Sequence, residues 1–234
     1  MNAAVIASPP GTLVAELERV LGKEHVSADA ETRDFYSRDL SFRPYQVAAV
    51  VVRPGNLDEL SKVVGAATRA GHAVVARGGG MSYTSGYTPE RPDTVLVDMR
   101  RMNRVLEVNK EDMYVVVECG CTWKSLFETL NPLGLRTPYW GPLSGMYATV
   151  GGALSQNSLF HGSGTERTVA DSVLGLKVVL ADGSVLTTGS GAHKTSNPFW
   201  RHFGPDVTGL FTADTGAFGI KGVAVLRLLT LQKH

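Results

Sequence analysis

The chain has 234 residues with 23 Lys plus Arg against 22 Asp plus Glu, a formal net charge of +1, and no block of like charges. This balance argues against nucleic acid or a membrane surface as the main partner. Hydrophobic residues make up 43% and glycines number 26, which is typical of a turn-rich globular fold with a sizeable core. No apolar run approaches the roughly 20 residues of a membrane span, and we expect a cytoplasmic protein.

The first part of the chain predicts a βαβ unit preceded by a helix. The expected elements are a helix at 12–21, an irregular wrapping segment at 26–45, a strand at 47–52, a helix from 56 to about 70, and a strand at 74–76. We expect Asn56 to cap the second helix and Gly71 to close it. A right-handed crossover makes the two strands parallel, and α/β sheets bind ligands at the carboxyl ends of such strands.

A glycine-rich loop follows the strand at 74–76, with Arg77, Gly78, Gly79, Gly80, Met81 and Ser82 in succession. Three consecutive glycines leave backbone N–H groups uncovered and allow positive φ, so their amides can form a nest for a pyrophosphate. The spacing matches neither GxGxxG nor GxxxxGK[ST]. A flexible turn between two strands is the equal alternative for this motif alone. Arg77 would pair either with a phosphate or with a neighbouring carboxylate.

The later part of the chain predicts a hairpin, two helices and an antiparallel layer. The expected elements are a strand at 94–98, a hairpin of 105–108 with 114–118, helices at 122–130 and 149–157, strands at 173–180 and 185–187, a short helix within 206–220, and a last strand at 223–229. Thr122 should cap the first of these helices, whose buried face would carry Trp123, Leu126, Phe127 and Leu130.

The two cysteines, Cys119 and Cys121, fall at the end of the strand predicted at 114–118. A bridge between residues two apart would close a very small strained ring, and no second pair or nearby histidine completes a metal site. We therefore expect two small buried residues and no metal.

The helix predicted at 149–157 contains a second glycine-rich place, because its first turn holds Val150, Gly151 and Gly152. Bare amides at a helix start favour an anion. The alternative is a glycine-softened helix start that packs against a neighbouring segment. Two such places in one chain favour a diphosphate ligand.

Seven ordered segments together carry a resemblance to a known family. They read RPGNLDEL, ARGGGMS, VLVDMRRMNRVLEVN, YVVVECGCTW, GPLSGMYATVGGALSQNS, DSVLGLKVVLADGSVLTTG and DVTGLFTADTGAFGIKGVAVLRL. This set resembles the FAD-binding, PCMH-type domain of the vanillyl-alcohol oxidase and p-cresol methylhydroxylase superfamily, from about residue 47 to residue 229. The resemblance implies an α+β domain of two lobes, a small α/β lobe and a larger, mostly antiparallel lobe, with FAD between them.

The implied organisation is an N-terminal helix and wrapping segment at 1–46, a first lobe at about 47–110 and a second at about 111–234. The family assigns the diphosphate to the loop at 77–82, the flavin and diphosphate to the segment at 142–157, and the adenine end to backbone near Val173 and Ile220. The implied cofactor-binding residues are Arg77, Gly78, Gly79, Gly80, Met81, Ser82, Pro142, Gly145, Thr149, Val150, Gly151, Gly152, Ser155, Asn157, Val173 and Ile220.

The chain departs from the family pattern at both covalent flavin anchors. Met81 stands where many members carry a histidine that attaches the flavin, and Tyr147 stands near where some carry a cysteine. Methionine has no nucleophilic nitrogen. The resemblance therefore implies non-covalent FAD.

The resemblance implies alcohol, phenol or hydroxy-acid oxidation by hydride transfer to FAD, and we expect this chain to carry no counterpart of the family's substrate domain. We expect an FAD-binding domain or subunit of an oxidoreductase whose substrate domain is missing or on another chain. A second subunit or self-association would cover an apolar surface around Tyr139, Trp140 and residues 198–203. The alternative is a non-catalytic module for carriage or assembly of FAD. His161, His193 and His202 are candidate bases, although a lone histidine is more often a surface or packing residue.

Overall fold

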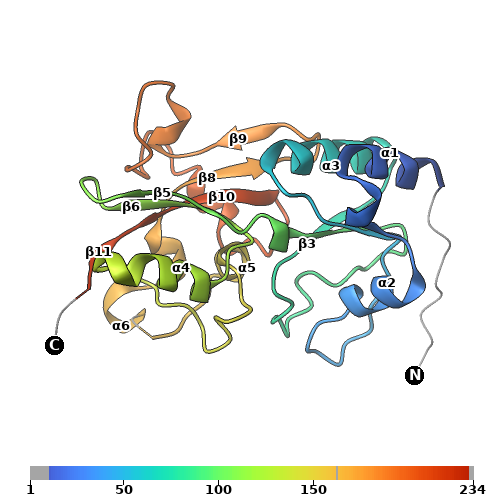
Figure 1. The fold of residues 1–234 in the computed structure, drawn as a ribbon, viewed down its shortest axis with the longest axis horizontal. Coiled ribbons are helices and arrows are strands. Elements are labelled where there is room, and N and C mark those ends of the chain that lie inside the picture. Colours follow the sequence, from blue (N-terminus) through green and yellow to red (C-terminus); the bar gives the residue numbers. More distant parts are fainter. Residues whose placement is uncertain (1–10, 162, 232–234) are drawn as a thin grey trace.

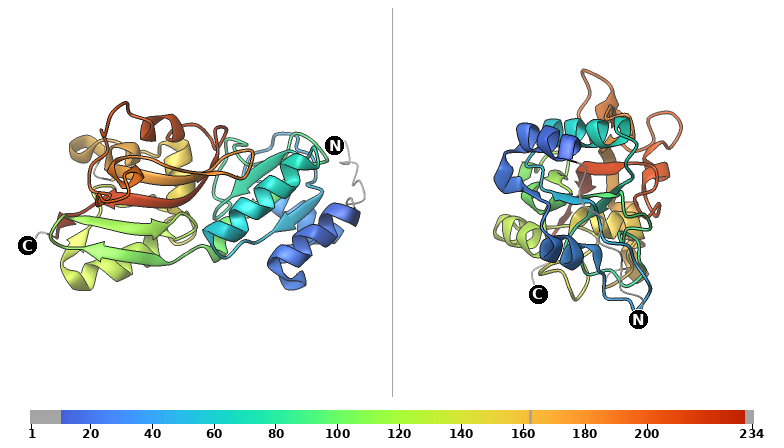
Figure 2. Two further views of the ribbon diagram at one scale, coloured as in Figure 1. Left: turned by 90° about the horizontal axis from the view of Figure 1, so that it is seen from above. Right: turned by 90° about the vertical axis from the view of Figure 1, so that its right-hand side faces the viewer.

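The computed structural model describes residues 11–161 and 163–231, and it has the α+β architecture of two lobes, each built on its own sheet (Figure 1). The first ten residues of the predicted N-terminal segment lie outside the described part. Seen from above, the lobes lie side by side along the long axis of the molecule (Figure 2). No helix in the described part of the chain combines the length and hydropathy that a membrane span requires.

The first lobe carries a four-stranded sheet in the order β1-β2-β4-β3, formed by Val26–Ser27, Val50–Val52, Val95–Asp98 and Val74–Arg77. β4 lies between β2 and β3 and is parallel to both, which confirms the parallel βαβ unit, while β1 is antiparallel to β2. Helices α1 (Gly11–Leu21) and α3 (Leu57–Arg69) pack together in the same apolar cluster as this sheet. The carboxyl ends of β2, β4 and β3 therefore share one edge.

The boundaries of α3 follow from local hydrogen bonding. The Asn56 side chain accepts a bond from the Glu59 amide at 2.9 Å, and the Glu59 carboxylate accepts one from the Gly55 amide at 2.7 Å. This reciprocal pattern satisfies amides that have no partner inside the helix. Gly71, with φ of 79°, ends the element as predicted.

The segment at 26–45 is not irregular as expected, because it contains β1 and α2 (Ala30–Ser37). The Asp29 carboxylate caps α2 by accepting a bond from the Thr32 amide at 2.8 Å. Arg33 is buried and donates from Nε to the Ala48 carbonyl at 2.7 Å, which ties α2 to the segment that leads into β2. The buried face of α2 is made by Arg33 and Ser37, so the helix shows no apolar periodicity in the sequence.

The second lobe carries a five-stranded antiparallel sheet in the order β5-β6-β10-β8-β9, formed by Val105–Asn109, Tyr114–Glu118, Ile220–Arg227, Val173–Val179 and Val185–Thr187. A two-stranded sheet pairs β7 (Leu135–Arg136) with β11 (Leu229–Thr230). Because β5 pairs with β6, residues 105–109 belong to the second sheet, ahead of the lobe boundary expected at about residue 110. The division between the two sheets falls between β4 and β5.

Short helices complete the fold. They are α6 (Ser163–Glu166) and the 3-10 helices η1 (Lys23–His25), η2 (Met99–Arg101), η3 (Asn131–Leu133), η4 (Val169–Ser172), η5 (Ser190–Ala192) and η6 (Thr208–Phe211). The last of these is the short helix predicted within 206–220.

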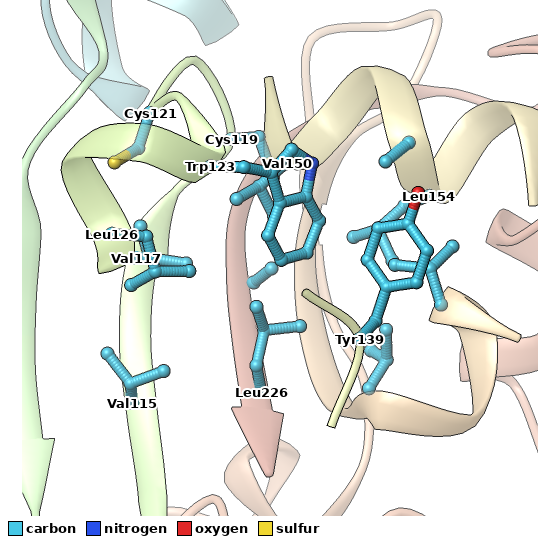
Figure 3. Packing of buried hydrophobic residues seen from close by; sticks show 14 of the residues in the cluster. Val115, Val117, Cys119, Cys121, Trp123, Leu126, Tyr139, Val150, Leu154 and Leu226 are labelled. Carbon is cyan, nitrogen blue, oxygen red and sulfur yellow. The ribbon is translucent and has the colours of Figure 1, made fainter. Parts of the chain in front are cut away.

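Helices α4 (Trp123–Leu130) and α5 (Val150–Gln156) cover one face of the second sheet. Figure 3 shows Val117 of β6, Leu226 of β10 and Val150 of α5 around the rings of Trp123 and Tyr139. These rings meet edge to face at 4.9 Å between centroids. Tyr139 is 1% exposed, which corrects its expected place on an open surface.

Phe127 is 41% exposed, so it does not belong to the buried face of α4 as expected. Its ring instead lies near that of Trp140, 6.2 Å between centroids. The other three predicted residues, Trp123, Leu126 and Leu130, are buried, and Thr122 caps the helix by accepting a bond from the Ser125 amide at 3.1 Å.

The two lobes are joined by shared packing and by hydrogen bonds. Val179 and Ile220 of the second sheet belong to the apolar cluster of the first lobe. From α3, Ser61 Oγ donates to the Gly183 carbonyl at 2.5 Å and Thr68 Oγ1 donates to the Ala181 carbonyl at 2.6 Å. These contacts fix the first lobe against the turn between β8 and β9.

Candidate functional site

The glycine loop leaves β3 at the carboxyl edge of the parallel strands, as predicted. Gly80 has φ of 74°, whereas Gly78 and Gly79 do not have positive φ. The amides of Gly79, Gly80, Met81 and Ser82 donate to no acceptor within residues 11–161 and 163–231. Four neighbouring N–H groups are therefore available to an anion, and anion binding at this loop stays a prediction.

The far end of this loop is anchored by the segment that follows α2. The Ser85 amide donates to the Asp39 carboxylate at 2.7 Å, and the Leu40 amide donates to the Ser82 carbonyl at 2.9 Å. Ser85 itself has φ of 60°. The loop is therefore held at both ends while its central amides remain free.

Arg77 lies beneath this loop and is 6% exposed. Its guanidinium carbon is 4.9 Å from the ring centre of Tyr36, 5.3 Å from that of Tyr87 and 5.9 Å from that of Phe35. Within the described chain, no carboxylate pairs with Arg77, and its buried Nε has no hydrogen-bond partner. The sequence left two roles for Arg77, pairing with a phosphate or with a neighbouring carboxylate. Pairing with a carboxylate is excluded among the described residues.

Two further arginines place positive charge at the same edge of the sheet. Arg53 and Arg100 also stack on the Tyr36 ring, at 5.2 and 5.4 Å from its centre. Both pair with the buried carboxylate of Asp98, at 3.7 and 2.8 Å. Because one carboxylate serves two guanidinium groups and Arg77 has no carboxylate partner among the described residues, this edge carries excess positive charge that favours an anion.

Tyr87 contributes its ring to this cluster rather than acting as a base. Burial raises the pKa of Tyr87, against a lowering effect of the nearby Arg77 charge. The protonated phenol donates to the Arg38 carbonyl at 3.0 Å.

The loop at 140–148 packs directly on the glycine loop. A Cβ at Gly79 would lie 1.8 Å from the Tyr147 carbonyl oxygen, and one at Gly78 would lie 2.2 Å from Thr149 Oγ1. No side chain can occupy such distances, so these glycines permit the close approach of two backbones. The two glycine-rich segments singled out in the sequence therefore meet in space.

The amides at the start of α5 donate to acceptors of the fold itself, which corrects the expectation that they are free to bind an anion. Val150 N donates to the Cys121 carbonyl at 2.9 Å, Gly151 N to the Cys119 carbonyl at 2.8 Å, and Gly152 N to Thr149 Oγ1 at 3.3 Å. These three N–H groups are not free to bind an anion. A Cβ at Gly151 would lie 2.8 Å from that of Cys119, so packing explains this glycine.

The C-terminal end of α5 also contacts the glycine-rich segment at 77–87, here called the glycine segment. Sequence reasoning missed this contact. Thr84 Oγ1 donates to Gln156 Oε1 at 3.2 Å, and Gly86 lies against the Gln156 amide group. Thus α5 touches the segment 77–87 at both of its ends, through Thr149 and Gln156. A polar residue at the last position of a glycine-rich helix was the signal available in the sequence.

Other predicted residues fall around these contacts. Pro142 and Gly145 form a turn in which the Gly145 amide donates to the Pro142 carbonyl at 2.8 Å. Ser155 accepts a backbone bond from Thr215 at 2.9 Å. Asn157 ends α5 with φ of 46°, and its buried Oδ1 has no hydrogen-bond partner in the described chain. Cofactor contact at these residues stays a prediction.

Val173 and Ile220 lie far apart on the second sheet, and adenine contact at either residue stays a prediction. In the antiparallel ladder of β8 and β10, Val173 is opposite Leu226 and Ile220 is opposite Val179. The two residues are therefore at opposite ends of the ladder, about 20 Å apart at the usual rise of a strand. The strand register, which the sequence does not show, decides this.

The cysteines and histidines form no reactive cluster in the described part of the chain. Cys119 and Cys121 are buried and unbridged, and burial raises their thiol pKa values to about 12 and about 11. His161, His193 and His202 are exposed. Among the described residues, no group of three His, Cys, Asp or Glu side chains could hold a metal ion.

Comparison with known proteins places this arrangement in a family. A family model described as an FAD binding domain matches residues 48–189. The chain is 32% identical to a mitochondrial D-lactate dehydrogenase (cytochrome) of Arabidopsis thaliana over 230 residues, covering 96% of this chain and 38% of that protein. It is 28% identical to glycolate oxidase subunit GlcD of Bacillus subtilis, covering 92% of this chain and 44% of that protein.

Solved structures share the fold. An alkyldihydroxyacetonephosphate synthase superposes with a TM-score of 0.85 at 21% identity, covering 99% of this chain and 43% of that chain. A p-cresol methylhydroxylase with substrate bound gives 0.82 at 20% identity, covering 94% of this chain and 43% of that chain. The chain spans less than half the length of the curated relatives it matches. It belongs to the FAD binding domain family and has the PCMH-type fold.

Proposed function

We propose that this chain is the FAD-holding part of a flavin-dependent oxidoreductase that acts on an alcohol, a phenol or a hydroxy acid. The observation that carries the proposal is Arg77, a buried cation with no carboxylate partner in the described chain, beneath the free amides of Gly79–Ser82. A diphosphate brings negative charge to the cation and acceptor oxygens to the amides. The residues present therefore fit this part of FAD.

FAD, when bound, supplies the hydride acceptor, and the chain must bind it, orient it and exclude water from it. Arg77 would balance the diphosphate charge, and the amides of Gly79, Gly80, Met81 and Ser82 would hold its oxygens. The aromatic rings around Arg77 keep the guanidinium in place without neutralising it. The loop at 140–148 would form the opposing wall, because it already packs on Gly79.

We further propose that the flavin is held without a covalent bond. Met81 occupies the position of the family's attaching histidine, and Tyr147 lies near that of its cysteine. The two cysteines of the chain are buried and keep their protons, because burial raises their pKa values. Acid precipitation should leave a colourless pellet and a yellow supernatant, and flavin retained in the pellet would contradict non-covalent binding.

The substrate pocket would be completed by a further domain or a second subunit. Support comes from the share of the curated relatives that this chain spans, and from GlcD being named a subunit. Leu143, Met146 and Tyr147 are exposed on the loop that packs on Gly79. Apolar side chains at such a place suit a covering partner. The cytoplasm stays our expected compartment.

The proposal is tested with purified protein, FAD and two arginine variants. The wild type should be yellow or take up one FAD per chain. Arg77→Met should weaken FAD binding at least about tenfold, with folding retained because an unpaired buried charge is removed. Arg91→Met is the matched control, since it removes the same charge from an exposed pair with Asp93, and it should keep wild-type affinity.

A folded wild type that binds no FAD, or that binds a nicotinamide cofactor instead, would refute the proposed function. Unchanged FAD affinity in a folded Arg77→Met variant would remove Arg77 from the binding site.

A further inference from the structure

A fully buried ion pair lies at the start of β10. Lys221 is the second residue of this strand, and its Nζ lies 2.7 Å from Asp214 Oδ1. The side chains of Lys221 and Asp214 are 2% and 1% exposed. A buried pair of this kind seldom stabilises a fold more than apolar residues of similar volume would. A lysine in the buried part of this strand therefore needs another explanation.

Asp214 holds the loop at 213–219 as well as the lysine. Its Oδ1 accepts a bond from the Gly216 amide at 3.0 Å, and its Oδ2 accepts one from the Phe218 amide at 3.4 Å. Ala213 and Thr215 adopt φ of 59° and 51°, a left-handed conformation that costs energy in residues other than glycine. The carboxylate thus keeps a strained loop in one conformation.

This strained loop supports the end of α5. The Ala213 amide donates to the Leu154 carbonyl at 3.0 Å, and the Thr215 amide donates to the Ser155 carbonyl at 2.9 Å. The last carbonyls of a helix have few partners within it, so these bonds fix the end of the helix. The next residue, Gln156, makes the contact with Thr84 of the glycine segment.

We propose that Asp214 is a positioning residue for the FAD site and that Lys221 balances its buried charge, an inference that rests on the proposed function. Asp214 fixes the loop at 213–219, the loop fixes the end of α5, and α5 sets the distance between the loop at 140–148 and the glycine segment. An apolar pair would fill the same space but would leave the amides of Gly216 and Phe218 without an acceptor.

Three double variants separate positioning from packing. Asp214→Leu with Lys221→Met removes the charges and the acceptor but keeps the volume. Asp214→Asn with Lys221→Met removes the charges and keeps an oxygen for the Gly216 amide. Asp58→Leu with Lys62→Met makes the same replacements in an exposed pair of α3 and serves as the control.

FAD affinity is measured by fluorescence titration, and folding by the thermal midpoint of the FAD-free protein. We expect the Leu/Met variant to fold with a midpoint near that of the wild type and to bind FAD at least tenfold more weakly. The Asn/Met variant should recover affinity to within threefold of the wild type, and the control should match the wild type. Amide hydrogen exchange at 213–219 should be faster in the Leu/Met variant than in the other two.

Wild-type FAD affinity in the Leu/Met variant would overturn the positioning role, and so would a loss of affinity that the Asn/Met variant does not recover. A wild type that binds no FAD would instead show the proposed function itself to be wrong. If the Leu/Met variant does not fold, amide hydrogen exchange of the wild-type protein is compared with and without FAD. FAD should slow exchange at 213–219, and unchanged exchange would overturn the inference.

Discussion

The glycine loop after β3 and the start of α5 look alike in the sequence but differ in the structure. At the loop, four successive amides are free and a buried arginine has no carboxylate partner in the described chain. At the start of α5, the three amides donate to carbonyls and a hydroxyl of the fold itself. Glycine allows both a ligand site and a close approach of two chain segments, and only the acceptors around it tell them apart.

The largest effect should come from Gly79→Val, which tests whether the loop's glycines also serve packing. The new Cβ would lie 1.8 Å from the Tyr147 carbonyl, so we expect a loss of stability of about 3 kcal/mol or more. Thermal unfolding and soluble yield measure it. Gly164→Val is the control, because a Cβ there meets nothing within 4 Å. A Gly79→Val protein of wild-type stability would show that the two loops separate freely.

Gly151→Ala tests the other region of this comparison, the start of α5, whose amides are bonded within the fold. Its Cβ would press on Cys119 at 2.8 Å, and we expect a loss of about 1–3 kcal/mol in chemical denaturation. FAD affinity of the folded protein should not change, because the Gly151 amide is already bonded. Gly152→Ala, where the nearest atom is 3.3 Å away, should change stability by less than about 1 kcal/mol. Weaker FAD binding in Gly151→Ala would contradict the conclusion that the start of α5 serves packing and does not bind the cofactor.

The buried thiols beside α5 predict a loss of stability in alkali. Their folded pKa values of about 12 and 11 lie above the ordinary value of 9.0, so the folded protein keeps protons that the unfolded chain releases. The contribution of these protonated thiols to the free energy of unfolding is complete below about pH 9 and is lost as the pH rises toward 11 to 12. The expected slope is about 1.4 kcal/mol per pH unit for each thiol.

Denaturant titrations between pH 8 and 11 measure this slope. Replacing Cys119 and Cys121 by alanine should reduce it, since other titrating groups remain the same in both proteins. An equal slope in the alanine variant would show that the thiols titrate alike in the folded and unfolded states.

The smallest effect should come from the contact between α5 and the glycine segment. Gln156→Ala removes the acceptor of Thr84 Oγ1, which should lower stability by about 0.5–1 kcal/mol because the bond is exposed. A cycle with Thr84→Ala isolates the pair, and the two changes should be less than additive. Full additivity would mean that this bond contributes nothing in solution.

The sequence by itself determined the elements whose signals are local. Asn56 and Thr122 cap their helices as predicted because a cap needs only the next three residues. The hairpin of β5 and β6 and the parallel arrangement of β2 and β3 follow from strand spacing and connection length. Seven ordered motifs also identified the FAD-binding family, because the order of segments is a property of the chain alone.

Only the tertiary structure decided which groups meet. It showed that β5 belongs to the second sheet, and that Val173 and Ile220 lie at opposite ends of one ladder. It showed that Arg77 has aromatic neighbours in place of a carboxylate, and that Lys221 reaches Asp214. Each of these facts depends on residues far apart in the chain or on strand register. Whether an amide is free or bonded likewise depends on its neighbours in space, and the spacing of glycines in the sequence does not predict those neighbours.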